Sequence, residues 1–145
     1  MLIPDVNLLV YAYNSDAPEH RKARIWWETT LSSTGTVGLP WAVLLGFMRV
    51  MTSRRILVTP LTAAEAIAHM RSWLDQPQTQ IVQPGPRHLD LLDNLAASAR
   101  GGAELTTDLH LAALAIENQA ELHSNDSDFK RFPGLRWVNP LQSDR

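Results

Sequence analysis

The chain begins with Met1–Tyr13, MLIPDVNLLVYAY, in which a short apolar run ends at an acidic residue and a helical pattern follows. The apolar pair Leu2-Ile3 is typical of a buried strand, and the run is interrupted before Asp5. From Val6 onward the apolar residues recur at helical spacing. This stretch therefore predicts a strand, then Asp5, then a helix, which is how an α/β domain begins.

The rest of the chain continues this alternation of short apolar runs and helical patterns. Helices are predicted to begin near Asp16, which stands two residues before a proline, at Pro40, at Leu61-Thr62 with Glu65 in capping-box spacing, at Arg87 and at Thr107. Further strands are predicted over Thr36–Leu39, Thr79–Gln83, Ala120–Ser124 and Leu135–Val138. Strands separated by helices favour a parallel sheet that is covered by helices on both faces.

The composition limits the classes of function that remain. The chain has 145 residues, 45% of them hydrophobic, which predicts a single domain over residues 1–145. It has no cysteine, so a cysteine-based zinc site and a thiol nucleophile are excluded. The formal net charge of −2 excludes a uniformly basic surface, so any polyanion must bind locally. Met1–Val10 carries Asp5 and no basic leader, so we expect a cytoplasmic protein without a membrane span.

Acidic residues stand where the predicted strands end. Asp5 follows the first strand, Asp126 and Asp128 follow the fourth, and Asp108 lies in the first turn of the helix before it. Parallel sheets gather functional groups beyond the carboxyl ends of their strands, so these acids converge if the first and fourth strands are neighbours. Clustered carboxylates repel one another unless a cation bridges them, and oxygen ligands suit Mg²⁺ or Mn²⁺. The pattern predicts metal-assisted attack on a phosphate ester.

Each of these residues also fits a structural role when it is taken alone. Asp is favoured at the start of a helix, so Asp5 and Asp108 are equally explained as caps. Asp126 and Asp128 are also explained as turn residues, and for Asp128 alone that explanation is favoured. Only the joint placement of the four residues favours a metal site.

Four segments of the chain resemble one known family: IPDVNLLVYAY (3–13), GLPWAVLLGFMRV (38–50), LTTDLHLAALAIE (105–117) and HSNDSDFKRFPGLRWVNPL (123–141). They are similar to a PIN domain, and specifically to a VapC-type toxin of a bacterial type II toxin–antitoxin pair. The resemblance implies a three-layer α/β/α domain with a central parallel sheet of four to five strands. It also implies a metal-dependent endoribonuclease, whose partners are RNA, a cognate antitoxin protein and a second toxin copy. We therefore expect a homodimer and a toxin–antitoxin hetero-oligomer.

The resemblance also assigns roles to particular residues. Asp5, Asp108 and Asp126 match the catalytic acids that bind Mg²⁺ or Mn²⁺, and Asp128 resembles an accessory metal ligand. Two polar residues stand where the family often has side chains that brace these carboxylates. These residues are Asn7 and Ser124.

One departure from the family pattern favours a different function. Members often carry a further acid on the helix after the second strand, whereas Trp41–Ser53 contains no Asp or Glu and the matching region is Leu45-Gly46. The alternative is a catalytically weakened PIN-like module that binds RNA or an antitoxin without cleavage. A receiver-like phosphoacceptor domain is disfavoured, because neither of the two lysines, Lys22 and Lys130, suitably follows a late strand.

Basic, aromatic and histidine side chains provide weaker indications. Arg49, Arg54 and Arg55 lie on or just after the helix that begins at Pro40, where they are candidates to contact RNA phosphates beside the metal or are simply a solvated helix face. The adjacent Trp26-Trp27 pair cannot share one helix face, so one ring is predicted to reach the surface or a partner. The five histidines lack metal-ligand spacing and are expected to be structural.

Overall fold

A five-stranded parallel sheet forms the centre of the structure, a computed structural model that describes residues 1–142. Its strands are β1 (Leu2–Pro4), β2 (Val37–Pro40), β3 (Thr79–Val82), β4 (Glu121–His123) and β5 (Arg136–Val138). They lie side by side in the order β3-β2-β1-β4-β5, and every neighbouring pair is parallel. The predicted parallel sheet is confirmed, and its first and fourth strands are neighbours at the centre.

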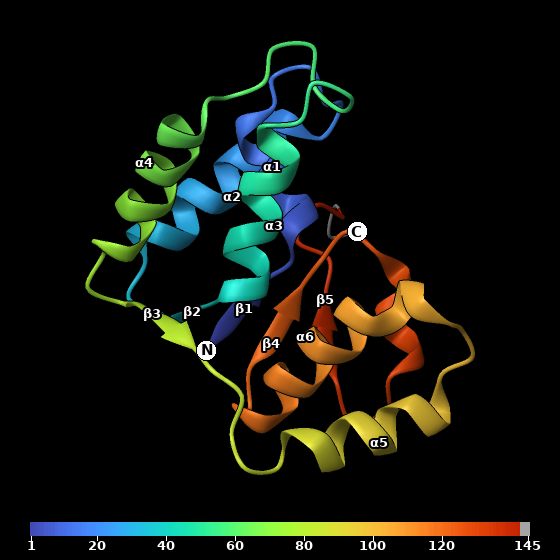
Figure 1. The fold of residues 1–145 in the computed structure, drawn as a ribbon. Coiled ribbons are helices and arrows are strands. Elements are labelled where there is room, and N and C mark those ends of the chain that lie inside the picture. Colours follow the sequence, from blue (N-terminus) through green and yellow to red (C-terminus); the bar gives the residue numbers. More distant parts are fainter. Residues whose placement is uncertain (143–145) are drawn as a thin grey trace.

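Helices cover both faces of this sheet (Figure 1). The α-helices are α1 (Val6–Tyr13), α2 (His20–Ser32), α3 (Trp41–Met51), α4 (Ala63–Leu74), α5 (His88–Ser98) and α6 (Thr106–Glu117), and two 3₁₀ helices are η1 (Ala103–Leu105) and η2 (Ser127–Arg131). Helix α1 packs on α2 and α3, and α3 packs on α4, whereas α5 packs on α6 across the sheet. The three-layer α/β/α architecture is therefore confirmed.

Local sequence explains where α4 begins but predicts the start of α2 too early. Thr62 caps α4, because its hydroxyl accepts from the backbone N–H of Glu65 while the Glu65 carboxylate accepts from the backbone N–H of Thr62, as the capping-box spacing predicts. The prediction of a helix start near Asp16 is wrong. Helix α2 begins four residues later, because a turn at Asn14 holds the backbone N–H of Asp16 on its side-chain oxygen.

Buried apolar side chains form one core around the two central strands. Ile3 of β1 and Leu122 of β4 are fully buried, and the middle of α6, Leu111–Ala115, is buried along its whole length. On the other face the rings of Trp73 and Phe47 pack edge to face at 4.7 Å. The sheet edge beyond β1 and β4 is therefore held between two rigid layers.

Three further expectations concern a membrane span, the single domain and the adjacent tryptophans. Between residues 1 and 142 we find no helix with the length and apolar character needed to cross a membrane. The predicted single domain over residues 1–145 includes 143–145, which lie outside the described residues. Of the adjacent tryptophans, Trp27 is buried and Trp26 is partly exposed on the other side of α2.

Candidate active site

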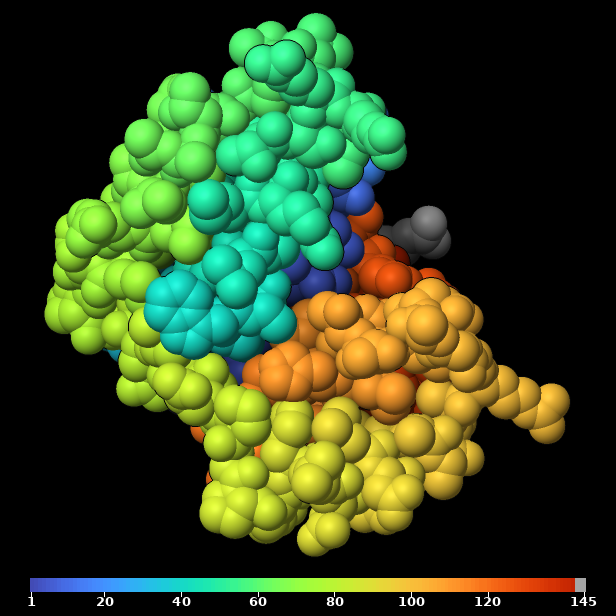
Figure 2. Space-filling model, viewed as in Figure 1, coloured from blue at the N-terminus to red at the C-terminus, as the bar shows by residue number. Residues whose placement is uncertain are grey.

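The acidic edge of the sheet lies where β1 and β4 end. Pro4 pairs with His123, and the backbone N–H of Asp5 donates to the carbonyl oxygen of His123 at 2.8 Å. Asp5 and Asp126 therefore follow neighbouring strands, as their convergence requires. The space-filling view shows the blue start of the chain between the teal atoms of α3 and the orange atoms of α6, whose first turn carries Asp108 (Figure 2).

Asp5 uses its two carboxylate oxygens for different purposes. Oδ1 accepts from the backbone N–H of Val6 at 2.7 Å, which caps α1. Oδ2 accepts from the hydroxyl of Ser124 at 2.7 Å, across the gap between β1 and β4. The capping role and a functional role for Asp5 are compatible, because the cap occupies one oxygen only.

Ser124 connects three parts of the acidic edge. It is fully buried, and its hydroxyl donates to Asp5 while accepting from the backbone N–H of Asp126 at 3.0 Å and from Nδ2 of Asn7 at 3.3 Å. The loop after β4 is thereby tied to the start of α1. These are the contacts that bracing side chains would make, and the part that Asn7 and Ser124 play in any chemistry stays a prediction.

Asp108 lies in the electrostatic field of the other carboxylates. Its pKa is raised to about 6, first by partial burial and then by the negative charges of Asp5, Asp126 and Asp128. The positive charge of Arg131 opposes this rise. Within residues 1–142 no hydrogen bond fixes the Asp108 side chain, and α6 has no side-chain cap. The capping explanation therefore does not account for Asp108.

Burial also affects the carboxyl group of Asp5. It raises the pKa of Asp5, and the hydrogen bonds from Ser124 and Val6 act in the opposite direction. The charge of Asp126 adds to the rise. The negative charge of Asp126 therefore acts on both Asp5 and Asp108, although the three residues are far apart in the sequence.

Asp126 and Asp128 are held by the 3₁₀ helix that follows β4. Oδ1 of Asp126 accepts from the backbone N–H of Asp128 at 2.9 Å and caps η2. Asp128 is exposed, and its Oδ2 lies 3.0 Å from Nη2 of Arg131. The hydrogen bond from Asp126 to Ser124 therefore ties Asp126 to the acidic edge, whereas the carboxylate of Asp128 is paired with the guanidinium of Arg131.

The side chains at the acidic edge do not form a complete cage for a divalent cation. No group of three His, Cys, Asp or Glu side chains within residues 1–142 is arranged to hold a metal ion by itself. Oδ1 of Asn7, however, is buried without a hydrogen-bond partner there, and the pKa values of Asp5 and Asp108 are raised first by burial and further by neighbouring negative charges. Mg²⁺ is commonly held by one or two carboxylates with waters and phosphate oxygens. The residues fit such a partly hydrated ion and not a closed protein cage.

Helix α3 contributes no acid to this edge. Leu45 is 55% exposed, whereas Gly46 is buried against α1. A Cβ atom at position 46 would lie 2.7 Å from Cγ2 of Val6, closer than real side chains approach. A glycine is therefore required where α3 crosses α1, and a carboxylate is absent from the region where the family often has one.

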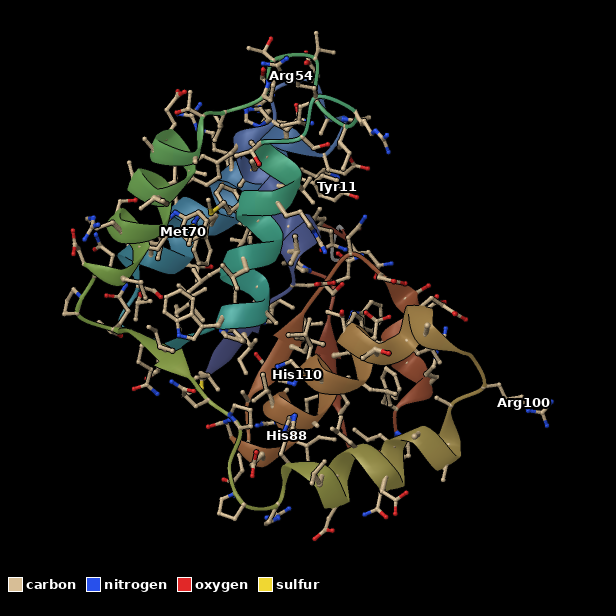
Figure 3. All side chains as sticks on the ribbon, viewed as in Figure 1. Tyr11, Arg54, Met70, His88, Arg100 and His110 are labelled. Atoms are coloured by element: carbon tan, nitrogen blue, oxygen red, sulfur yellow. The ribbon has the colours of Figure 1, made fainter. Side chains whose placement is uncertain are left out.

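The candidate RNA-binding arginines are not gathered at the acidic edge. Arg49 is exposed near the end of α3, and Arg54 and Arg55 are exposed in the turn after it. Figure 3 shows Arg54 at the tip of the molecule, beyond the end of α3 that lies away from the sheet. Because α3 spans roughly 16 Å at 1.5 Å per residue, phosphates that Arg54 and Arg55 contact would lie away from the carboxylates.

Two polar contacts depend on the fold and have no sign in the sequence spacing. Arg131 binds Asp128 three positions before it, within η2, and also donates to the backbone carbonyl of Arg100, which joins η2 to the loop before α6. His88 and His110 contact each other between α5 and α6, although 22 positions separate them. Only the fold brings Arg131 to Arg100 and His88 to His110, so no motif could have revealed these two contacts.

The sheet order and the acidic edge together define an α/β/α domain with a group of carboxylates beyond its central strands. The chain belongs to the PIN domain family, whose model matches residues 2–135. The family predicted from the four quoted segments is confirmed.

Individual relatives show which members of the PIN domain family this chain resembles. Ribonuclease VapC33 of Mycobacterium tuberculosis is 46% identical over 142 residues, which cover 98% of this chain and 99% of that relative. Ribonuclease VapC37 of the same species is 40% identical over 140 residues, which cover 97% of each chain. The predicted likeness to the VapC type is therefore confirmed over nearly the full length.

Solved structures share the fold at low sequence identity. VapBC2 from Rickettsia felis, bound to a DNA fragment from its promoter, matches with a TM-score of 0.69 and 20% identity over 95% of this chain and 97% of that one. VapBC-1 from nontypeable Haemophilus influenzae matches with a TM-score of 0.68 and 13% identity over 97% and 98% of the two chains. At these identities the likeness establishes the fold alone.

Proposed function

We propose that this protein is the toxin of a type II toxin–antitoxin pair and acts as an endoribonuclease that requires Mg²⁺ or Mn²⁺. Its relatives VapC33 and VapC37 carry the name ribonuclease, and their similarity covers nearly the whole chain. The observation that carries the metal-dependent part is the raised pKa of Asp108, about 6, caused first by partial burial and then by the charges of Asp5 and Asp126. Carboxylates that destabilise one another in this way favour a bound cation.

Asp5, Asp108 and Asp126 are the residues that would hold the ion in this proposal, with Asp128 as an accessory ligand. The chemistry that Mg²⁺ or Mn²⁺ supplies when bound is Lewis-acid charge against the oxygens of a phosphodiester. Asp128 would first have to leave Arg131, its present partner.

The chain's own side chains prepare this edge for an attacking water. Ser124 holds Oδ2 of Asp5 in one orientation, and the cap on α1 holds Oδ1. Asp108, whose side chain is free of hydrogen bonds within residues 1–142, is ionised above its pKa of about 6 and can accept a proton from water. Arg49, Arg54 and Arg55 remain candidates for contacts to RNA phosphates farther along the strand.

The proposal includes protein partners. The fold neighbour from Rickettsia felis is a VapBC assembly on promoter DNA, which supports a cognate antitoxin for this chain. Trp41 and Leu45 are 46% and 55% exposed one turn apart on α3, so they present an apolar face that supports a homodimer or a toxin–antitoxin hetero-oligomer. The predicted cytoplasmic location, where the RNA substrate resides, stays part of the proposal.

Cleavage of total cellular RNA by the untagged, antitoxin-free protein tests this function. We expect discrete fragments with Mg²⁺ or Mn²⁺, none with EDTA, and none from Asp5→Asn, since Asn still caps α1 but lacks the charge. The matched control is Asp93→Asn, an exposed residue of α5, which should cleave like the wild type. Equal cleavage by Asp5→Asn and the wild type would overturn the proposal.

A second candidate function is a PIN-like module that binds RNA or an antitoxin without cutting. Two observations favour it: α3 carries no acid, and residues 1–142 contain no three-residue group arranged to hold a metal ion. The same assay separates the two functions. A folded wild-type protein that leaves RNA intact with every metal ion would support the binding module.

A further inference from the structure

One positive charge acts on the acidic edge. It belongs to Arg131, the last residue of η2, which follows Asp126 and Asp128 along the chain. The charge of Arg131 lowers the pKa of Asp108, whereas the charges of Asp5, Asp126 and Asp128 raise it. Arg131 is therefore near enough to the carboxylates to attract an anion that is brought to them.

The neighbouring basic residues of the chain are engaged elsewhere. Nζ of Lys130 lies 5.3 Å from the centre of the Trp137 ring, so its charge rests on an aromatic face. Arg136 donates to the backbone carbonyl of Gln119, which precedes β4 and so lies at the opposite end of that strand from the acidic edge. Of these three residues, Arg131 is therefore the one that serves the acidic edge.

Two backbone carbonyl groups hold the guanidinium of Arg131. Its Nε donates to the carbonyl oxygen of Asp128 at 2.9 Å, and its Nη1 donates to that of Arg100 at 3.4 Å. The side chain of Arg100 points away from the molecule in Figure 3, so its backbone alone takes part. Because both anchors are backbone atoms, the guanidinium stays in place when the carboxylate of Asp128 turns away.

The ion pair between Arg131 and Asp128 is open to exchange. Nη2 of Arg131 lies 3.0 Å from Oδ2 of Asp128, and the two side chains are 28% and 61% exposed. An ion pair so open to water is screened and weak, so another anion can replace the carboxylate. The guanidinium presents its N–H groups in a planar fork that matches two oxygens of a phosphate. Arg131 is therefore anchored by the backbone and available to a phosphate.

We propose that Arg131 binds a phosphate of the RNA strand beside the acidic edge, in place of the carboxylate of Asp128. This inference rests on the proposed function and names the residue that receives the RNA at that edge. The carboxylates of Asp5, Asp108 and Asp126 repel a polyanion, and the guanidinium offsets this repulsion where the strand must approach. Arg131 is a binding residue and takes no part in proton transfer.

Fluorescence anisotropy with a short labelled poly(U) oligonucleotide, in EDTA so that the proposed nuclease is inactive, tests this contact. Phosphate contacts do not depend on base sequence, so poly(U) is a sufficient probe. We expect Arg131→Gln to weaken binding by about tenfold and to reduce the slope of log affinity against log salt by about 0.7, the share of one phosphate on a single strand. The matched control is Arg71→Gln, which removes the same charge from an exposed position of α4 and should keep the wild-type slope.

Asp128→Asn provides a test of the opposite sign. Loss of this carboxylate frees Nη2 of Arg131, so poly(U) should bind more tightly than it binds Asp93→Asn, which removes an equal charge from an exposed position of α5. This difference should disappear when both variants also carry Arg131→Gln. An ion pair that only stabilises η2 predicts no tighter binding by Asp128→Asn.

The contact and the nuclease proposal fail in different ways. Affinity and salt slope that are unchanged in Arg131→Gln, or a wild type that does not bind poly(U), would overturn the contact. Weaker binding by Arg131→Gln, beside a wild type that cuts no RNA with any metal ion, would support the contact and reject the nuclease. If circular dichroism shows that Arg131→Gln fails to fold, Arg131→Lys decides, because it keeps the charge and loses the planar fork. It should bind poly(U) more weakly with an unchanged slope, and wild-type affinity would overturn the contact.

Discussion

Single residues at the acidic edge combine a structural contact with a chemical one. The hydroxyl of Ser124 satisfies Asp5, Asn7 and the backbone of Asp126 at once, and Asp5 caps α1 with its other oxygen. The side chain of Asp108 has no hydrogen-bond partner within residues 1–142, and its pKa is raised to about 6 by partial burial and by the neighbouring negative charges. Asp5 and Ser124 are therefore held by hydrogen bonds that stabilise the acidic edge, whereas the surroundings of Asp108 disfavour its ionised form.

Asp108→Asn should make the protein more stable at neutral pH. The pKa of Asp108 is about 6 in the folded state against an ordinary value of 3.8, so the folded state binds this proton more tightly and loses stability as pH rises from about 4 to 6. Because the side chain is partly exposed, solvent screening reduces the effect, and we expect a gain of about 1 kcal/mol at pH 8. Urea unfolding at pH 8 and pH 4 measures it. The gain should vanish at pH 4, and lower stability of the variant at pH 8 would contradict this explanation.

Ser124→Ala should impair the site through Asp5. The hydrogen bond from Ser124 lowers the pKa of Asp5, so its loss raises that pKa further and moves the acidic limb of the cleavage profile to higher pH. We expect cleavage to fall by roughly 10- to 100-fold, as for other residues that orient metal ligands. The measurement is the pH dependence of the cleavage rate. Ser98→Ala, at an exposed position of α5, is the control, and a rate loss without a pH shift would reject this role.

The helices and strands show what the sequence could predict and what it could not. Alternating apolar patterns identified the strands and helices, and the capping-box spacing located the start of α4, because these are local effects. The start of α2 was predicted too early, because the turn at Asn14 competes for Asp16. The need for glycine at position 46 could not be predicted either, since it arises where α3 crosses α1.

Substitutions at two neighbouring positions of α3 should have different effects on stability, because one position is buried against α1 and the other is exposed. Gly46→Glu forces a side chain into the space of Val6 and should lower the free energy of unfolding by about 2–3 kcal/mol. Leu45→Glu adds the same group at an exposed position and should change it by less than about 0.5 kcal/mol. Thermal and urea unfolding of both variants provide the comparison. Equal stability of the two would show that α1 and α3 are not closely packed at this crossing.

The whole molecule joins residues that no local pattern connects. The first and fourth strands were expected to be neighbours only as a condition for the acids to converge, and the sheet order meets that condition. The contacts of Arg131 with Arg100, and of His88 with His110, could not be predicted, because each depends on how distant elements pack. The positions of the predicted strand ends identified the four acids as candidates, and the resemblance to a family assigned their roles, since shared segments carry long-range information that periodicity lacks.

Cleavage of total cellular RNA by Asp108→Asn beside the wild type, in Mg²⁺ at pH 7.5, tests the central claim most directly. If Asp108 serves the chemistry, the variant is folded, at least as stable as the wild type, and slower by about 100-fold or more. If Asp108 is only a residue of the first turn of α6, the variant cleaves RNA at the rate of the wild type. That second result would contradict the assignment of the acidic edge as the active site.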